Sequence, residues 1–325
     1  MKKILLITLF SLFAFAGANA QIVKFKTVDD GGSGPYKAIA ASEETLPDFT
    51  VYRPEDLEKI DDPLPIIIFG NGGCANSSLG HERFLTDLAS YGYIVVAIGP
   101  FQESREPRPA QGAPAGAGAP RPQGAPAGAG APRPQGAPAG PGGQGAPAMM
   151  VSSESYMMFK ALDWIVNQAQ NSRTAYYGKV NVDQVAAMGM SCGGCQAIYL
   201  SCDPRVTTLV VLNSGMGTMT LANATPRNVK AIHCPTVYIT GGEADIAYKN
   251  AEVDYNTLTD VPVAWMNLPV GHGGTYAQEF GGDFARMARA WLDYTMKGRT
   301  ENERIFKQLD LTGFDGWTAQ SKNFK

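Results

Sequence analysis

The sequence carries a serine in a setting typical of an enzyme nucleophile. Residues 189–193 read Gly-Met-Ser-Cys-Gly, a G-x-S-x-G motif between an expected strand (184–190) and an expected helix (194–201). A sharp strand-to-helix turn exposes the serine hydroxyl, and it needs flanking glycines because larger side chains would collide there. The motif therefore predicts Ser191 as a nucleophile that attacks a carbonyl carbon.

A serine hydroxyl needs a base that takes its proton, and the chain contains three histidines. His81 opens an expected helix, and His233 precedes a strand at the opposite edge of the sheet, so both are expected to be structural or solvent-facing. His272 directly follows the last expected strand, in a glycine-rich loop (270–275). Position and elimination predict His272 as the base.

The imidazole in turn needs a carboxylate that orients it and stabilises its charged form. The expected strand 235–240 is followed by a loop that contains Glu243 and Asp245. Asp245 is the first candidate because it lies deeper in this loop, and Glu243 is the alternative.

Backbone N–H groups must stabilise the negative oxygen that develops during attack on a carbonyl. The first donor is expected to be the N–H of Cys192, the residue after the nucleophile. The second is expected from the Gly-Asn-Gly-Gly-Cys loop at 70–74, where glycines allow close approach of the backbone. Gly72 and Gly73 are equal candidates.

Five cysteines permit at most two disulfides. Cys74 and Cys192 lie on the two loops expected to form the oxyanion hole, so they are the first candidate pair. Cys202 and Cys234 precede adjacent strands and are the second, which leaves Cys195 as a free, buried thiol. The C-x-x-C at 192–195 is the alternative signal of a thioredoxin-like redox site. It has neither a second pair nor a histidine in register, so no metal site is expected.

The elements that must position these residues alternate between strands and helices. Strands are expected at 37–41, 49–53, 64–69, 93–98, 184–190, 207–212, 235–240 and 262–268, and helices at 82–91, 153–170, 194–201, 247–255 and 284–296. This alternation predicts an α/β fold with a doubly wound, mostly parallel sheet. In such sheets the functional residues lie in loops beyond the carboxyl ends of the strands.

The first twenty residues are typical of an export signal. Lys2 and Lys3 precede a short apolar stretch (4–15), and the small-x-small run Ala-Asn-Ala at 18–20 suits a signal peptidase. We therefore expect residues 1–20 to be removed, leaving 21–325 as a single domain in the periplasm or outside the cell. The predicted cleavage point has no lipoprotein cysteine, and no later segment is apolar enough to span a membrane.

The middle of the chain has a different composition. Residues 107–148 are almost wholly Pro, Gly, Ala, Gln and Arg, and the twelve residues 111–122 recur unchanged at 123–134. Such a segment cannot offset its ordering entropy by burying apolar surface. We expect a disordered insertion within the domain, and a tether to the cell surface or to a partner is the alternative. The chain has no run of basic residues, and the formal net charge of all 325 residues is −3. Both observations argue against nucleic-acid binding.

These motifs together resemble the α/β-hydrolase superfamily, and within it the branch of dienelactone hydrolases, chlorophyllases and cutinase-like polyester hydrolases. The resemblance spans about residues 33–300 outside the insertion, and its segments are 69–74, 88–93, 189–194, 241–245 and 271–274. It implies ester hydrolysis through an acyl-enzyme without a cofactor, with Ser191, Asp245 and His272 in the catalytic roles. Two departures are a serine in place of the dienelactone hydrolase cysteine, and no Gly-aromatic pair in the oxyanion loop.

The sequence thus predicts an exported carboxylesterase, with acyl groups on extracellular polysaccharide as the expected substrate. The same triad would serve an acyltransferase, a peptidase or a polyester hydrolase. A binding or scaffold protein that uses the Pro-rich repeat is the alternative outside the enzymes.

Overall fold

The computed structural model describes residues 21–103 and 152–324. The predicted signal peptide (1–20) and the predicted disordered insertion (107–148) lie outside the described residues, so both stay predictions. No helix among the described residues is long and apolar enough to cross a membrane.

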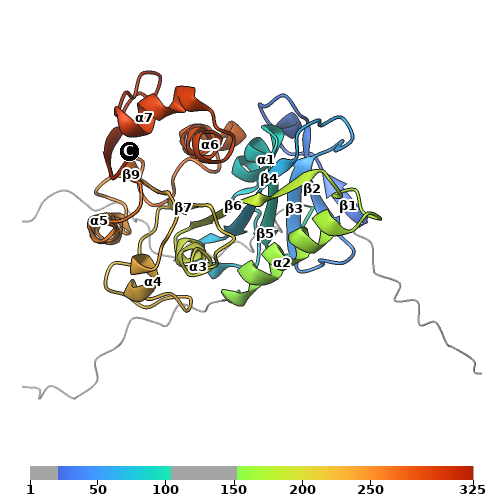
Figure 1. The fold of residues 1–325 in the computed structure, drawn as a ribbon, viewed down its shortest axis with the longest axis horizontal. Coiled ribbons are helices and arrows are strands. Elements are labelled where there is room, and N and C mark those ends of the chain that lie inside the picture. Colours follow the sequence, from blue (N-terminus) through green and yellow to red (C-terminus); the bar gives the residue numbers. More distant parts are fainter. Residues whose placement is uncertain (1–20, 104–151, 325) are drawn as a thin grey trace, which may run out of the picture. The chain divides into compact units, whose positions relative to one another are not determined.

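The described residues form a ten-stranded sheet in the order β1-β2-β3-β5-β4-β6-β7-β8-β9-β10 (Figure 1). The six neighbouring strands β5-β4-β6-β7-β8-β9 are parallel to one another. At one side of them β1, β2 and β3 pair antiparallel, and at the other side β10 pairs antiparallel with β9. The strands are β1 (Ile22–Lys26), β2 (Ala38–Glu43), β3 (Phe49–Pro54), β4 (Leu64–Gly70), β5 (Ile94–Ile98), β6 (Val180–Met190), β7 (Thr208–Leu212), β8 (Thr236–Thr240), β9 (Val263–Asn267) and β10 (Thr318–Lys322).

The central strands are apolar on both faces because helices cover both. All seven residues of β4 are buried. Ile66 and Ile68 pack into one hydrophobic cluster, and the alternate residues Ile67 and Phe69 pack into the other. A strand covered on both faces reads as a continuous apolar run. The predicted α/β fold with a mostly parallel sheet is confirmed.

Figure 1 shows the helices in two layers, with α1 and α6 on one face of the sheet and α2 and α3 on the other. Each buries a helical stripe: Leu162 and Ile165 of α2 enter one cluster, and Phe284 and Trp291 of α6 enter the other. The helices are α1 (Glu82–Ser90), α2 (Tyr156–Gln170), α3 (Cys192–Leu200), α4 (Pro226–Lys230), α5 (Tyr248–Thr257), α6 (Gly282–Met296) and α7 (Glu303–Lys307).

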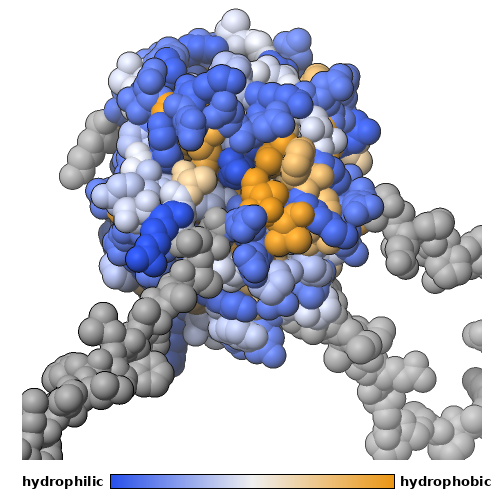
Figure 2. All heavy atoms as spheres, turned by 90° about the vertical axis from the view of Figure 1, so that its right-hand side faces the viewer, coloured by the Kyte–Doolittle hydropathy of each residue, from blue (hydrophilic) through white to orange (hydrophobic). Residues whose placement is uncertain are grey.

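Four elements were not predicted from the sequence: the two outermost strands, β1 and β10, and the short helices α4 and α7. β10 reads Thr-Ala-Gln-Ser-Lys, without apolar alternation, and forms because β9 offers it a free edge. On β1, Val23 and Phe25 are exposed with Lys24 between them. Figure 2 shows this side of the molecule, where hydrophobic side chains gather amid a mostly hydrophilic surface. Interspersed lysines are a common protection of an edge strand against pairing with another chain.

Candidate active site

Ser191 occupies the sharp turn between β6 and α3. Its backbone has φ 54° and ψ −121°, a conformation that L-residues rarely adopt. The Ser191 N–H donates to the carbonyl of Leu212 at the end of β7 (2.9 Å), which ties the turn to the neighbouring strand. The surrounding structure therefore holds the strained serine in place.

The flanking glycines are required because backbone segments meet there. A Cβ at Gly189 would lie 2.0 Å from the carbonyl oxygen of Gly193, and a Cβ at Gly193 would lie 2.1 Å from that of Gly70. These distances are far shorter than any van der Waals contact, and the obstructing atoms belong to the backbone. The turn thus brings the end of β4, with its oxyanion-loop candidates, against the start of α3.

The structure brings the three predicted triad residues together. His272 Nε2 lies 3.0 Å from Ser191 Oγ, and His272 Nδ1 lies 2.6 Å from Asp245 Oδ1. Asp245 is buried, whereas the alternative acid, Glu243, is exposed. This chain of hydrogen bonds has the geometry needed to transfer a proton from serine to imidazole and to hold the imidazole in one tautomer.

Asp245 is held by more than the imidazole. Its Oδ2 accepts hydrogen bonds from the N–H of Gly241 (2.9 Å) and the Asn213 amide (2.7 Å), and its Oδ1 accepts one from the N–H of Ala247 (3.0 Å). Burial works to raise the pKa of Asp245, but these bonds and the one to His272 lower it to about 2. The carboxylate therefore stays ionised at neutral pH and can stabilise a charged imidazolium.

Two residues of this network escaped the sequence analysis. The Tyr276 hydroxyl donates to Asn213 Oδ1 (2.5 Å), which leaves the Asn213 amide to donate to Asp245. Burial, together with the nearby Asp245 charge, raises the pKa of Tyr276 well above its usual value, so the phenol remains a donor. Asn213 directly follows β7, and the rule that functional residues follow strand ends could have found it. No sequence pattern pointed to Tyr276.

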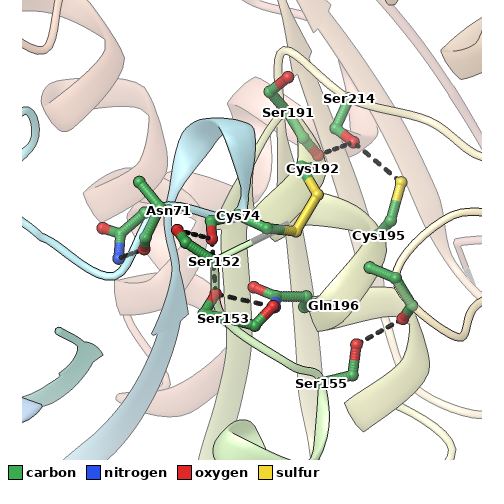
Figure 3. Close-up of a disulfide and its surroundings, with 12 residues drawn as sticks. Asn71, Cys74, Ser152, Ser153, Ser155, Ser191, Cys192, Cys195, Gln196 and Ser214 are labelled. Atoms are coloured by element: carbon green, nitrogen blue, oxygen red, sulfur yellow. Dashed lines mark hydrogen bonds between the residues drawn. A yellow bond between two sulfur atoms is a disulfide. The ribbon is translucent and has the colours of Figure 1, made fainter. Parts of the chain in front are cut away.

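The loop after β7, which carries Asn213, is fixed at two further points. The Ser214 hydroxyl donates to the carbonyl of Ser191 (2.6 Å), as Figure 3 shows. The buried Asp254 carboxylate accepts the N–H groups of Met216 (2.5 Å) and Gly217 (2.8 Å). Burial raises the pKa of Asp254 to about 6. The loop is thus held from both the nucleophile turn and α5.

A disulfide joins the two loops expected to form the oxyanion hole. Cys74 and Cys192 are bonded, with their Cα atoms 5.1 Å apart, and this predicted pair is confirmed (Figure 3). Cys192 is the first residue of α3, where backbone N–H groups have no partner within the helix. The carbonyl of Cys74 accepts hydrogen bonds from the Ser152 hydroxyl (3.0 Å) and from the N–H and hydroxyl of Ser153 (2.9 Å each).

Gly72 and Gly73 belong to a short 3₁₀ helix, Gly72–Cys74, that follows β4. A Cβ at Gly72 would lie 2.7 Å from the Met190 sulfur, so Gly72 packs against the residue that precedes the nucleophile. Gly73 has φ 64° and faces open space. Both stay candidates for the second donor beside the N–H of Cys192.

The second predicted disulfide is wrong, because Cys202 and Cys234 are free thiols, as is Cys195. The Cys202 sulfur, just after α3, accepts a hydrogen bond from the amide of Asn228 in α4 (3.5 Å). Cys234 is buried just before β8, and burial raises the pKa of its thiol to about 12. Adjacent strand starts were too coarse a signal, since pairing also requires that the two side chains point toward one another. Burial also raises the pKa of Cys195, to about 11.

The other two histidines are not members of the triad. His81 is buried between the rings of Phe69 and Tyr276, with both ring centroids 5.1 Å away. His233 Nε2 lies 3.1 Å from the carbonyl of Val206, before β7 and β8 begin. Within residues 21–103 and 152–324, no group of three or more His, Cys, Asp or Glu side chains is placed to hold a metal ion.

Comparison of the sequence with protein-family models and with curated proteins found no match. The geometry of the site is therefore the basis for assigning a function.

Proposed function

We propose that this protein is a serine hydrolase of the α/β-hydrolase type that cleaves carboxylic esters through an acyl-enzyme. The observation that carries the proposal is the hydrogen-bonded chain from Ser191 Oγ through His272 to the buried Asp245 carboxylate. The strained turn that presents Ser191 supports the same reading, because backbone strain clusters at functional sites.

In the proposed reaction His272 Nε2 takes the Ser191 proton while Oγ bonds to the ester carbonyl carbon. The resulting oxyanion would be stabilised by the N–H of Cys192 and by Gly72 or Gly73. The C–O bond to the alcohol then breaks, and His272 returns the proton to the leaving oxygen. Water repeats the sequence on the acyl-enzyme, which releases the acid and restores Ser191.

The substrate class follows from the predicted export of the chain. An esterase outside the cytoplasm meets polymers that carry acyl groups, and we propose such acyl decorations on polysaccharide as the substrate. Transfer of the acyl group to an acceptor other than water would use the same groups, and adding a competing alcohol to the assay would reveal it as a new ester product.

The test is hydrolysis of p-nitrophenyl esters, from acetate to octanoate, by the mature protein and by Ser191→Ala. Turnover by the wild type that is lost in Ser191→Ala, but kept in Ser172→Ala at an exposed loop serine, would support the proposal. A fluorophosphonate should label Ser191 in the wild type and in Ser172→Ala, and should not label Ser191→Ala. If the wild type neither turns over any ester nor is labelled, the proposal fails and a binding or scaffold role becomes the better reading.

A further inference from the structure

The loop that offers Gly72 and Gly73 as candidate donors is fixed at Cys74, which directly follows them. Cys74 has φ 47°, a left-handed conformation that residues other than glycine rarely adopt. Such a conformation persists only where the surrounding structure holds it. The disulfide to Cys192 holds the Cys74 side chain. The Cys74 carbonyl is held separately, by the segment that precedes α2.

Ser153 bonds this carbonyl twice. Its N–H and its hydroxyl both donate to the Cys74 carbonyl oxygen at 2.9 Å, and the Ser152 hydroxyl donates to the same oxygen at 3.0 Å. Ser153 is buried, whereas Ser152 is exposed. A hydrogen bond in the low-dielectric interior is stronger than one that water can reach. The Ser153 hydroxyl therefore contributes more than the Ser152 hydroxyl to the position of the carbonyl.

Gln196 of α3 sets the direction in which the Ser153 hydroxyl points. The Gln196 amide nitrogen donates to the Ser153 carbonyl and to Ser153 Oγ, at 3.2 Å each. Because Oγ accepts this bond, its own hydrogen points to the Cys74 carbonyl (Figure 3). Gln196 is fully buried, and a buried amide is unfavourable unless it is hydrogen-bonded. These bonds therefore fix Gln196 and Ser153 relative to one another.

Both supports of Cys74 start from one face of α3. Cys192 and Gln196 lie one helical turn apart in this helix, a spacing that places two side chains on the same face. Cys192 reaches the Cys74 side chain through the disulfide, and Gln196 reaches the Cys74 carbonyl through Ser153. The helix that begins at the nucleophile Ser191 therefore also carries the supports of the oxyanion loop.

The turn of this loop uses some of its N–H groups and leaves others. The N–H of Cys74 donates to the Asn71 carbonyl (3.1 Å), and the N–H of Ala75 donates to the Gly72 carbonyl (3.2 Å). The Asn71 amide in turn donates to the Ala75 carbonyl (3.1 Å), which closes the loop. The N–H groups of Gly72 and Gly73 stand first in the short 3₁₀ helix, where they have no partner within the helix. A shift of Cys74 would therefore move both candidate donors.

We propose that Ser153 and Gln196 are positioning residues for the oxyanion hole. By holding the Cys74 carbonyl, they keep the N–H groups of Gly72 and Gly73 where the oxygen of the tetrahedral intermediate gains its charge. The inference rests on the proposed ester hydrolysis and assigns to it two residues outside the triad. Donors of this kind act on the transition state more than on the bound substrate. Loss of the support should therefore lower kcat and leave KM nearly unchanged.

The experiment compares p-nitrophenyl acetate kinetics of the mature wild type, Ser153→Ala and Gln196→Met. Ser201→Ala is the matched control, because the Ser201 hydroxyl is also buried and donates to a backbone carbonyl, that of Ile198 (2.8 Å), at the other end of α3. We expect kcat to fall about tenfold in both test variants, since a small displacement of a group at the reacting centre is costly. Ser201→Ala should keep the wild-type kcat.

Inhibition by phenylboronic acid provides the second measurement, because its tetrahedral adduct with Ser191 places an oxygen in the oxyanion hole. Its inhibition constant should rise about tenfold in Ser153→Ala and Gln196→Met, in parallel with the fall in kcat, and stay unchanged in Ser201→Ala. A serine with only a structural role would behave differently. Its loss would lower the melting temperature as Ser201→Ala does, without changing kcat or the inhibition constant.

Ser153→Ala removes a single oxygen atom, so it decides the matter if Gln196→Met proves unstable. Wild-type kcat and inhibition in Ser153→Ala, an equal fall in Ser201→Ala, or a raised KM with unchanged kcat would overturn the proposal. A loss in Ser153→Ala but not in a folded Gln196→Met would overturn the role of Gln196. A wild type without ester turnover or fluorophosphonate labelling would instead overturn the proposed function, and this inference with it.

Discussion

Removal of the Cys74–Cys192 disulfide should lower both stability and turnover. The bond closes a loop with a sequence separation of 118 residues, and for a loop of this length the chain-entropy relation gives about 5 kcal/mol of stabilisation. Cys74 also adopts φ 47°, which disfavours the native loop by about 1 kcal/mol. The loop should therefore relax once the bond is absent and displace Gly72 and Gly73 from the N–H of Cys192.

The assay compares wild type, Cys74→Ala/Cys192→Ala and the free-thiol control Cys202→Ala by urea unfolding and p-nitrophenyl ester kinetics. The double variant is expected to lose about 5 kcal/mol of unfolding free energy. Its kcat should fall about 10- to 100-fold with little change in KM, because an oxyanion hole acts on the transition state. A reducing agent should reproduce both losses in the wild type and change nothing in the double variant.

Two results would refute this reasoning. A double variant with wild-type kcat would show that the disulfide does not position the groups that stabilise the oxyanion. A loss of stability as large in Cys202→Ala would show that the effect comes from replacing a cysteine side chain and not from opening the loop.

Three other predictions concern the triad and its turn. Asp245→Asn should lower kcat about 10⁴-fold, because an amide cannot keep His272 in the tautomer that accepts the serine proton; a wild-type kcat would remove Asp245 from the mechanism. The pKa of Asp245 is lowered from 3.8 to about 2, so its ionised form adds about 2 kcal/mol of stability above pH 3.8, and this is lost as the pH falls from 3.8 to 2. Urea unfolding across this range should show the loss in wild type but not in Asp245→Asn, and an equal loss in both would contradict it. Gly193→Ala would place a methyl group 2.1 Å from the Gly70 carbonyl oxygen, so turnover should vanish and the melting temperature should fall; an active variant of normal stability would argue against the close packing of the turn.

Local pattern was enough to predict the central sheet and the residues at its edge. β4 is buried on both faces, and its sequence is a short, continuous apolar run. Such runs indicate parallel strands because the signal lies in the composition and length of the strand itself. Once those strands are placed, the loops after them lie at one edge. This rule predicted that Ser191, Asp245 and His272 would meet, although they lie far apart in the chain.

Only the tertiary structure decided which side chains touch. The Tyr276 hydroxyl orients Asn213 toward Asp245, and the Arg289 guanidinium stacks on Tyr91, through contacts that no spacing encodes. The same limit explains the wrong pairing of Cys202 with Cys234, since neighbouring strand starts say nothing about side-chain direction. Periodicity along the chain determines elements and their order, whereas contacts between distant segments depend on how those elements pack.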